Sequence, residues 1–168
     1  GSVWGADTRV TNEAHESLSP SLAEGTDGAL HLAWTDRRGG YFGVYGSDYT
    51  GGVWSAATLI SQKNTTTSEP HVALSADNTQ HVLWTDFRSG LGLLYYRSRT
   101  NGVWSTSSMV GLSLNAVDHA ALAGGPSNTA AIAWTENLST GVSGIYTSTR
   151  QGTLWTAPST LASGTGNA

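Results

Sequence analysis

The stretch that decides the fold is QHVLWTDFRSG over 80–90, because its text recurs twice elsewhere in the chain. It returns as LHLAWTDRRGG over 30–40 and as AAIAWTENLST over 130–140. One tryptophan stands at the centre of each copy, and these tryptophans are 50 residues apart: Trp34, Trp84 and Trp134. A fixed spacing of this size is typical of propellers and solenoids. The chain therefore consists of three tandem copies of one unit.

Two further ladders of aromatic residues share this period. A second tryptophan ladder recurs in segments such as GGVWSAATLI and NGVWSTSSMV, at Trp4, Trp54, Trp104 and Trp155, and a tyrosine ladder stands at Tyr45, Tyr95 and Tyr146. Equivalent aromatic residues in every copy usually serve packing, so we expect these ladders in the core between copies. The last copy has one extra residue between Trp134 and Tyr146, which we expect in a loop.

Turn signals divide each copy into four short strands, which we call a to d. In the first copy the expected strands cover 19–23, 29–35, 41–47 and 53–60. The a–b turns carry pairs that tolerate the positive φ of tight hairpins: Asp27-Gly28, Asp77-Asn78 and Ser127-Asn128. The c–d turns carry Gly51-Gly52, Asn101-Gly102 and Gln151-Gly152. No stretch has a helical period, so the pattern predicts an all-β fold.

Strand b has two largely apolar faces. Leu30, Leu32 and Trp34 share one face, while His31 and Ala33 share the other. A single exposed sheet would show one polar face, whereas a blade between two neighbouring blades is buried on both sides. The pattern therefore predicts a β-propeller of four-stranded antiparallel blades.

Three blades are too few to close a ring, since propellers typically have four to eight blades. We expect a single repeat domain over 1–168 that divides into an extra d-type strand (1–12, the strand itself over 3–11), blade 1 (13–62), blade 2 (63–112), and blade 3 with a C-terminal tail (113–168). Homo-oligomers usually have closed symmetry, so we expect a homodimer of six blades, with a homotrimer as the alternative. The surplus d-type strand would pair with the third blade of the partner in place of that blade's own d strand. Alternatively, the chain is a fragment of a longer propeller.

Composition excludes several classes of function. The chain has no cysteine, which rules out disulfides and thiolate chemistry. It has a net charge of −4 without a basic cluster and without an apolar run of the ~20 residues that span a bilayer, so we expect no nucleic-acid or membrane partner. Its histidines lack metal-ligand spacing, so we expect no metal and no cofactor. A single lysine, few charges and abundant Gly, Ser and Thr are typical of exported bacterial β-proteins, which favours a secreted or cell-surface location.

The d–a and b–c loops should emerge on one rim, where most of the charge lies. At the start of strand a, Ser19, Glu69 and His119 are equivalents, and so are Ser21, His71 and Ala121. This variation suits a small-molecule or glycan site, although drift of a surface would produce it too. The candidate ligand-binding residues are Arg37, Arg38, Glu69, His71, Arg88, Asp118 and His119. No catalytic residue is assigned.

Several of the polar residues have a structural interpretation. We expect Asp36, Asp86 and Glu136 to hold their own b–c turns through hydrogen bonds to the backbone. The turn arginines could clamp a carboxylate or stack on a sugar, or else lie solvated in the turn. His31 and His81 lie within strand b and are expected to be core histidines with satisfied hydrogen bonds.

The runs HVLWTDFRSG, LYYRSRTNGVWS and ATLISQ, with the prolines of Ser19-Pro20 and Ser68-Glu69-Pro70, resemble the repeats of sialidase-like (BNR-type) β-propellers. This resemblance covers nearly the whole chain and implies a propeller fold. The family includes exo-sialidases, other glycosidases and lectin-like binders. Its catalytic members imply three arginines on the substrate carboxylate, a Tyr–Glu pair and an acid/base Asp. None of these roles is carried over to this sequence, because Arg37, Arg38 and Arg88 lie in repeated turns rather than in distinct family motifs. The family's Asp-box is matched only by Ser75 and Asp77, without its glycine and with Trp84 two residues late.

Three hypotheses for function follow. The first is a non-catalytic module that binds glycans or another extracellular ligand on the rim. The second is a sialidase-like glycoside hydrolase whose site assembles at a channel mouth shared by subunits, with Glu69 and Asp118 as carboxylates and Arg88 as an anion clamp. The third is a structural scaffold without a ligand.

Overall fold

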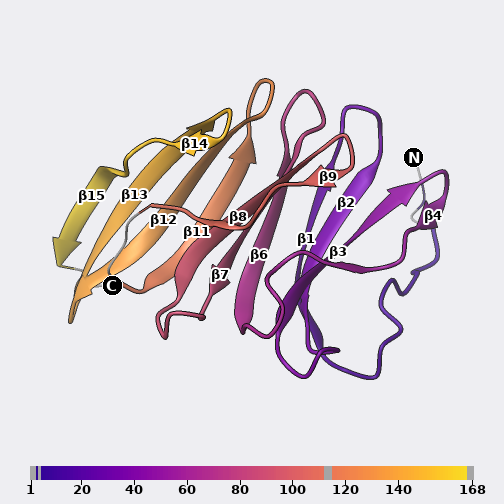
Figure 1. Cartoon of the computed structure of the whole chain (residues 1–168), viewed down its shortest axis with the longest axis horizontal. Helices are drawn as coiled ribbons and strands as arrows, with labels where there is room; N and C mark the ends of the chain where they lie inside the picture. Colours follow the sequence, from indigo (N-terminus) through magenta and orange to yellow (C-terminus); the bar gives the residue numbers. More distant parts are fainter. Residues whose placement is uncertain (1–2, 4, 112–114, 166–168) are drawn as a thin grey trace.

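The computed structural model describes residues 3, 5–111 and 115–165, and it arranges them in three antiparallel sheets that stand side by side (Figure 1). Blade 1 contains β1 (Ser17–Glu24), β2 (Leu30–Asp36), β3 (Gly43–Thr50), β4 (Val53–Trp54) and β5 (Thr58–Leu59). Blade 2 contains β6 (Thr67–Leu74), β7 (Gln80–Asp86), β8 (Leu93–Thr100), β9 (Val103–Trp104) and β10 (Ser108–Met109). Blade 3 contains β11 (Val117–Gly124), β12 (Thr129–Ser139), β13 (Val142–Gln151), β14 (Leu154–Trp155) and β15 (Ser159–Thr165).

Each blade is a meander in the predicted order a, b, c, d. The two outer strands of a blade both pair with its strand c, so together they form one divided strand d. The described residues contain no helix, and hence none long and apolar enough to cross a membrane. The all-β, propeller-like arrangement is therefore confirmed.

A hydroxyl group divides strand d at the same place in every blade. The residue after the second-ladder tryptophan accepts a hydrogen bond on its side chain from a backbone N–H of strand c, as from Asp48 N to Ser55 Oγ at 3.0 Å. Blades 2 and 3 repeat this bond from Ser98 N to Ser105 Oγ and from Thr149 N to Thr156 Oγ1. Because the side chain takes the place of a ladder bond, the outer strand is interrupted. The prediction of one uninterrupted strand d over 53–60 is therefore wrong.

The core lies between the blades. We call the side of each sheet that carries its strand-b tryptophan the tryptophan face, and the other side the reverse face. The first core joins the reverse face of blade 1 to the tryptophan face of blade 2, through Ala33, Val44, Ile60, Val72, Val82 and Trp84. The second joins the reverse face of blade 2 to the tryptophan face of blade 3, through Leu83, Leu94, Tyr96, Val110, Ile132 and Trp134. Every residue of β7 is buried, as the two apolar faces of strand b predict.

The tight turns confirm the pairs identified in the sequence. The a–b hairpins place Gly28, Asn78 and Asn128 at positive φ, and the c–d turns do so with Gly51-Gly52, Asn101-Gly102 and Gly152. In blade 3, however, β12 runs on to Ser139, so the connection between strands b and c over 135–141 is mostly strand. The extra residue of this copy is absorbed by an irregularity in register between Asn137 and Ser139, rather than by a loop.

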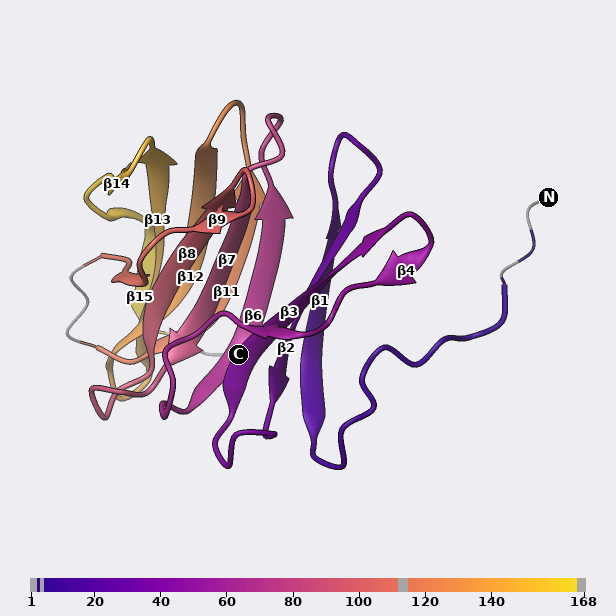
Figure 2. The same ribbon diagram turned by 45° about the vertical axis from the view of Figure 1, so that its right-hand side comes forward.

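The N-terminal segment differs from the expected strand. Residues 3 and 5–11 form no strand, and the segment runs away from β1 in Figure 2. A d-type strand needs the edge of a strand c, and within one chain all three such edges are occupied by each blade's own outer strands. Pairing of this segment with a second chain stays a prediction, and Trp4 lies outside the described residues.

Candidate functional site

The first strand of each blade, strand a, carries a β-bulge at the same position. The register shifts between Leu18 and Ser21 in β1, and the shifts in β6 and β11 are equivalent. One residue in each bulge adopts the left-handed conformation: Ser19 (φ 51°), Glu69 (φ 49°) and His119 (φ 47°). Such a φ is uncommon for residues other than glycine and costs free energy, and bulges often re-aim a side chain beside a functional site. The repeat thus maintains a strained feature in all three blades.

The three bulges line one cavity of about 300 Å³, which we call the bulge cavity. Its lining is Ser19, Pro20, Ser21, Glu69, Pro70, His71, His119 and Ala120. These residues come from β1, β6 and β11, the first strands of the three blades. Positions that are equivalent in sequence therefore bring three different polar side chains, a hydroxyl, a carboxylate and an imidazole, to a single site.

The polar groups of the bulge cavity differ in their electrostatics. Burial lowers the pKa of His71, and the charge of Glu69 opposes this shift only in part, so His71 is neutral at pH 7. Nδ1 of His119 lies 3.0 Å from Oδ1 of Asp118, and both side chains are exposed. Ser21 Oγ accepts a hydrogen bond from Val72 N at 3.0 Å. The cavity offers a carboxylate acceptor and imidazoles that can both donate and accept hydrogen bonds.

Four of the predicted site residues meet around this cavity. Glu69, His71 and His119 line it, while Asp118 stands beside it through its contact with His119. Ser19 and Ser21 are equivalent to these positions in the sequence, but neither serine is among the predicted site residues. A proline follows the left-handed residue in two blades, Pro20 and Pro70. A proline after an unusual backbone position was the signal that could have located the bulge.

Arg38 and Arg88 lie elsewhere, in clamps that hold the b–c turns. The Arg38 guanidinium donates to Asp36 Oδ2 at 2.8 Å and lies 4.6 Å from the centre of the Tyr45 ring. Arg88 repeats this arrangement with Asp86 at 2.6 Å, and lies 3.9 Å from its ring partner in strand c. Each guanidinium is therefore engaged by an aspartate of its own blade, and neither arginine lines the bulge cavity. A ligand-binding role for the two arginines stays a prediction.

The aspartates of these clamps combine several contacts. Asp36 accepts from Trp34 Nε1 at 2.9 Å and from Arg38 N at 2.8 Å, which confirms the expected turn-holding role. Burial alone would raise the pKa of the Asp36 carboxyl, but hydrogen bonds from Arg38 and Trp34 outweigh it and hold the pKa far below its usual range. Asp86 has the same partners in blade 2.

Blade 3 lacks this clamp. Glu136 accepts a hydrogen bond from Trp134 Nε1 at 2.9 Å, but among the described residues no backbone N–H of the turn donates to its carboxylate. Leu138 replaces the clamp arginine, which is why the blade can form a plain hairpin there. The turn-holding role predicted for Glu136 is therefore wrong.

Arg37 and the two strand-b histidines do not line the bulge cavity. Arg37 is exposed on the rim, 3.7 Å from Glu16 and away from the bulge cavity. His81 is buried between Ser75 Oγ at 2.9 Å and Tyr96 Oη at 2.6 Å, and burial lowers its pKa to about 4. His31 Nδ1 lies 2.8 Å from Asp48 Oδ1. Both are core histidines with partners, as expected, and the described part of the chain holds no cluster of three or more metal-ligating side chains.

The comparisons with known proteins bear on the fold. No protein-family model and no curated protein sequence matches the chain. Among solved structures, the chain is similar to the catalytic domain of a GH62 α-L-arabinofuranosidase from Coprinopsis cinerea, with a TM-score of 0.55 and 9% identity. The match covers 91% of this chain but only 53% of that one, so the chain spans about half its length. At this identity the similarity shows a shared arrangement of sheets, and the sialidase-like resemblance of the repeats stays a prediction.

Proposed function

We propose that this chain is a non-catalytic carbohydrate-binding module whose ligand occupies the bulge cavity. The observation that carries the proposal is the convergence of three equivalent left-handed bulges on one cavity with three different side chains, those of Ser19, Glu69 and His119. A purely structural repeat would gain nothing by keeping the strained backbone while varying its side chain. Strained positions persist where the surrounding structure holds them and cluster at ligand sites.

The chemistry of the cavity suits sugar hydroxyls. Ligand sites combine apolar walls with a few placed polar groups, and here Pro20, Pro70 and Ala120 lie beside a carboxylate and two imidazoles. Sugar hydroxyls both donate and accept, so they can pair with Glu69 as an acceptor and with a neutral His71 in either role. The similarity to a domain whose name includes an arabinofuranosidase activity agrees with a carbohydrate ligand. We extend this proposal to a secreted or cell-surface location, which the low lysine content favours.

Binding is favoured over hydrolysis because only one carboxylate, that of Glu69, is found among the lining residues. Most glycoside hydrolases use two carboxyl groups that flank the bond to be cleaved. Asp118 is the nearest second carboxylate by its contact with His119, but it does not line the cavity, and Arg88 is engaged by Asp86. A sialidase-like hydrolase with Glu69, Asp118 and Arg88 as its working residues is therefore the second candidate function.

The test is binding to a panel of immobilised glycans, followed by titration calorimetry with the best sugar. We expect binding to the unmodified chain, a loss of at least about tenfold in affinity for Glu69→Gln through the weakened charged hydrogen bond, and no release of product from fluorogenic glycosides. Glu24→Gln, an exposed carboxylate at the other end of β1, is the matched control and should bind normally. Equal affinities of the two variants would refute this site. Glycoside turnover that Glu69→Gln abolishes would establish the hydrolase instead.

A further inference from the structure

The two outermost faces of the chain repeat the two sides of its internal interfaces. Both internal interfaces join the reverse face of one blade to the tryptophan face of the next. Blade 1 therefore leaves its tryptophan face free, and blade 3 leaves its reverse face free, at opposite ends of the row of sheets in Figure 1. A third interface of the same kind would join them.

Blade 3 exposes side chains that its repeats bury. Ile145 is 45% exposed and Leu161 is 66% exposed on the reverse face. The equivalent side chains in blades 1 and 2 are at most 4% exposed, and these are Val44, Ile60, Leu94 and Val110. Ile145 has the same position in its sheet as Val44 and Leu94, so the difference at this position lies in the missing neighbour. Burial of such side chains is the main source of stability at an interface.

Blade 1 shows the complementary exposure. Leu22 on its tryptophan face is 56% exposed, whereas its equivalent Val72 is 7% exposed against blade 1. Size also matches at one pair of positions. In the first internal interface Ser21 of β1 meets β6 at Val72, and the closing pair would be Ala121 with Leu22. Alanines on one face therefore leave room for leucines on the other.

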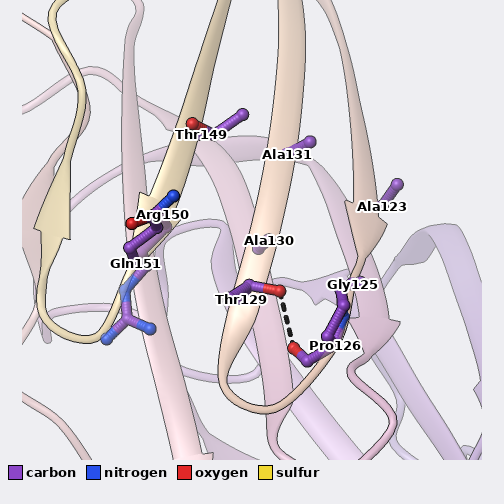
Figure 3. A pocket seen from close by; sticks show the side chains of 10 residues that line it. Ala123, Gly125, Pro126, Thr129, Ala130, Ala131, Thr149, Arg150 and Gln151 are labelled. Carbon is purple, nitrogen blue, oxygen red and sulfur yellow. Dashed lines mark hydrogen bonds between the residues drawn. The ribbon is translucent and has the colours of Figure 1, made fainter.

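A hollow on the reverse face of blade 3 extends this match to a single side chain. It has a volume of about 380 Å³, and Figure 3 shows Ala123, Ala131 and Thr149 along it on three neighbouring strands. In the first internal interface the equivalent place holds His31 and Asp48, and there the Arg99 guanidinium of blade 2 donates to Asp48 at 2.5 Å.

The side chain that fills this place differs from one interface to the next, according to the residues that line it. In the second internal interface, Arg150 enters the equivalent place and reaches Ser98 Oγ at 3.5 Å. The residue of blade 1 equivalent to Arg99 and Arg150 is Tyr49, which packs against Trp54 with ring centres 5.2 Å apart. A tyrosine ring suits a hollow lined by alanines, as an arginine suits one that holds an aspartate.

The closing interface would lack one hydrogen bond that both internal interfaces contain. Thr26 N donates to Asn78 Oδ1 of blade 2, and Ala76 N donates to Gly125 O of blade 3. The equivalent residue in blade 3 is Pro126, which has no N–H. The closing interface would therefore depend on apolar burial rather than on this bond.

We propose that a second copy of this chain covers both outer faces, with the reverse face of blade 3 in each copy packed on the tryptophan face of blade 1 in the other. The product is a closed dimer of six blades with two such interfaces, since a head-to-tail contact forms a ring where the rotation closes. In this closed ring the second copy also places its own Ser19, Glu69 and His119 on the side of the central axis. This proposal rests on the faces alone and does not depend on a carbohydrate ligand.

The first test places an aspartate on each face. Ile145→Asp and Leu22→Asp should each convert the dimer to a monomer in size-exclusion chromatography, with an unchanged circular dichroism spectrum because both side chains are exposed in a single chain. Leu154→Asp is the matched control. Its side chain is 76% exposed, and its equivalents Val53 and Val103 stay exposed even where neighbouring blades are present, so this variant should remain a dimer.

Three outcomes would overturn the proposal. A dimer that only Leu22→Asp disrupts would be a contact of blade 1 with itself. A dimer that only Ile145→Asp disrupts would be a contact of blade 3 with itself. A monomeric unmodified chain would mean that another occupant, such as further blades or a different protein, covers the two faces.

The second test joins the faces covalently. The chain has no cysteine, so Leu22→Cys combined with Ala121→Cys introduces the only two thiols. Under mild oxidation this double variant should run as a covalent dimer on a denaturing gel without reductant, while each single variant should run as a monomer. The equivalent internal contact, Val72 N to Ser21 Oγ, is 3.0 Å long. Absence of the crosslink, or crosslinking by either single variant alone, would contradict the proposed pairing of faces.

Discussion

Replacement of Gly124 by alanine should weaken the packing of blade 3 against blade 2. A Cβ atom at this position would lie 1.9 Å from the carbonyl oxygen of Leu74 and 2.8 Å from the backbone nitrogen of Ser75. Both neighbours are backbone atoms of blade 2, so a side-chain rotation cannot relieve the clash, and β11 must move by about 1 Å or more. Overpacking of this kind costs about 1–3 kcal/mol. For a chain of this size that cost lowers the melting temperature by about 2–12 °C.

The assay is thermal unfolding followed by the near-ultraviolet circular dichroism of the interface tryptophans. Gly164→Ala is the matched control, because this glycine also lies in a strand of blade 3 and an added Cβ there would meet nothing within 4 Å. The control should change stability by less than about 0.5 kcal/mol. Equal melting temperatures for the two variants would refute the close backbone contact between the blades.

Two further predictions concern the buried polar groups. Asp86→Asn should lower the free energy of unfolding by about 1–3 kcal/mol, because it weakens the hydrogen bonds from Arg88 and Trp84 to a buried carboxylate; urea denaturation measures this, and an unchanged midpoint would contradict it. Since burial lowers the pKa of His81 to about 4, against 6.5 for the free side chain, the unfolded chain binds this proton more readily. The stability that neutral His81 contributes is therefore complete above pH 6.5 and is lost as the pH falls toward 4. Melting temperatures measured across this range should fall more steeply for the unmodified chain than for His81→Gln, and parallel curves would show that His81 is not the group responsible.

Periodicity allowed much of the fold to be predicted from the sequence. The two tryptophan ladders located the blades, and the turn pairs such as Asn101-Gly102 located the hairpins, because their positive φ has a clear residue preference. Strand b carries apolar residues on both of its faces, and this pattern predicted that both faces of β7 would be buried. These features depend on local preferences that every copy repeats.

The candidate site was predictable only in part. The bulges were not foreseen, because serine and glutamate carry no strong signal for the left-handed conformation that Ser19 and Glu69 adopt. The sequence also does not show that Arg38 and Arg88 each lie over a tyrosine of the neighbouring strand while they pair with an aspartate, outside the bulge cavity. Both features depend on local backbone and side-chain geometry that residue types alone do not determine.

The proposed ring requires the two outer faces to pack as the internal faces of the blades do. The solution mass of the unmodified chain, measured by light scattering over a dilution series, tests this most directly. We expect twice the 17.5 kDa of one chain at micromolar concentration. A well-folded species with the mass of a single chain would contradict it.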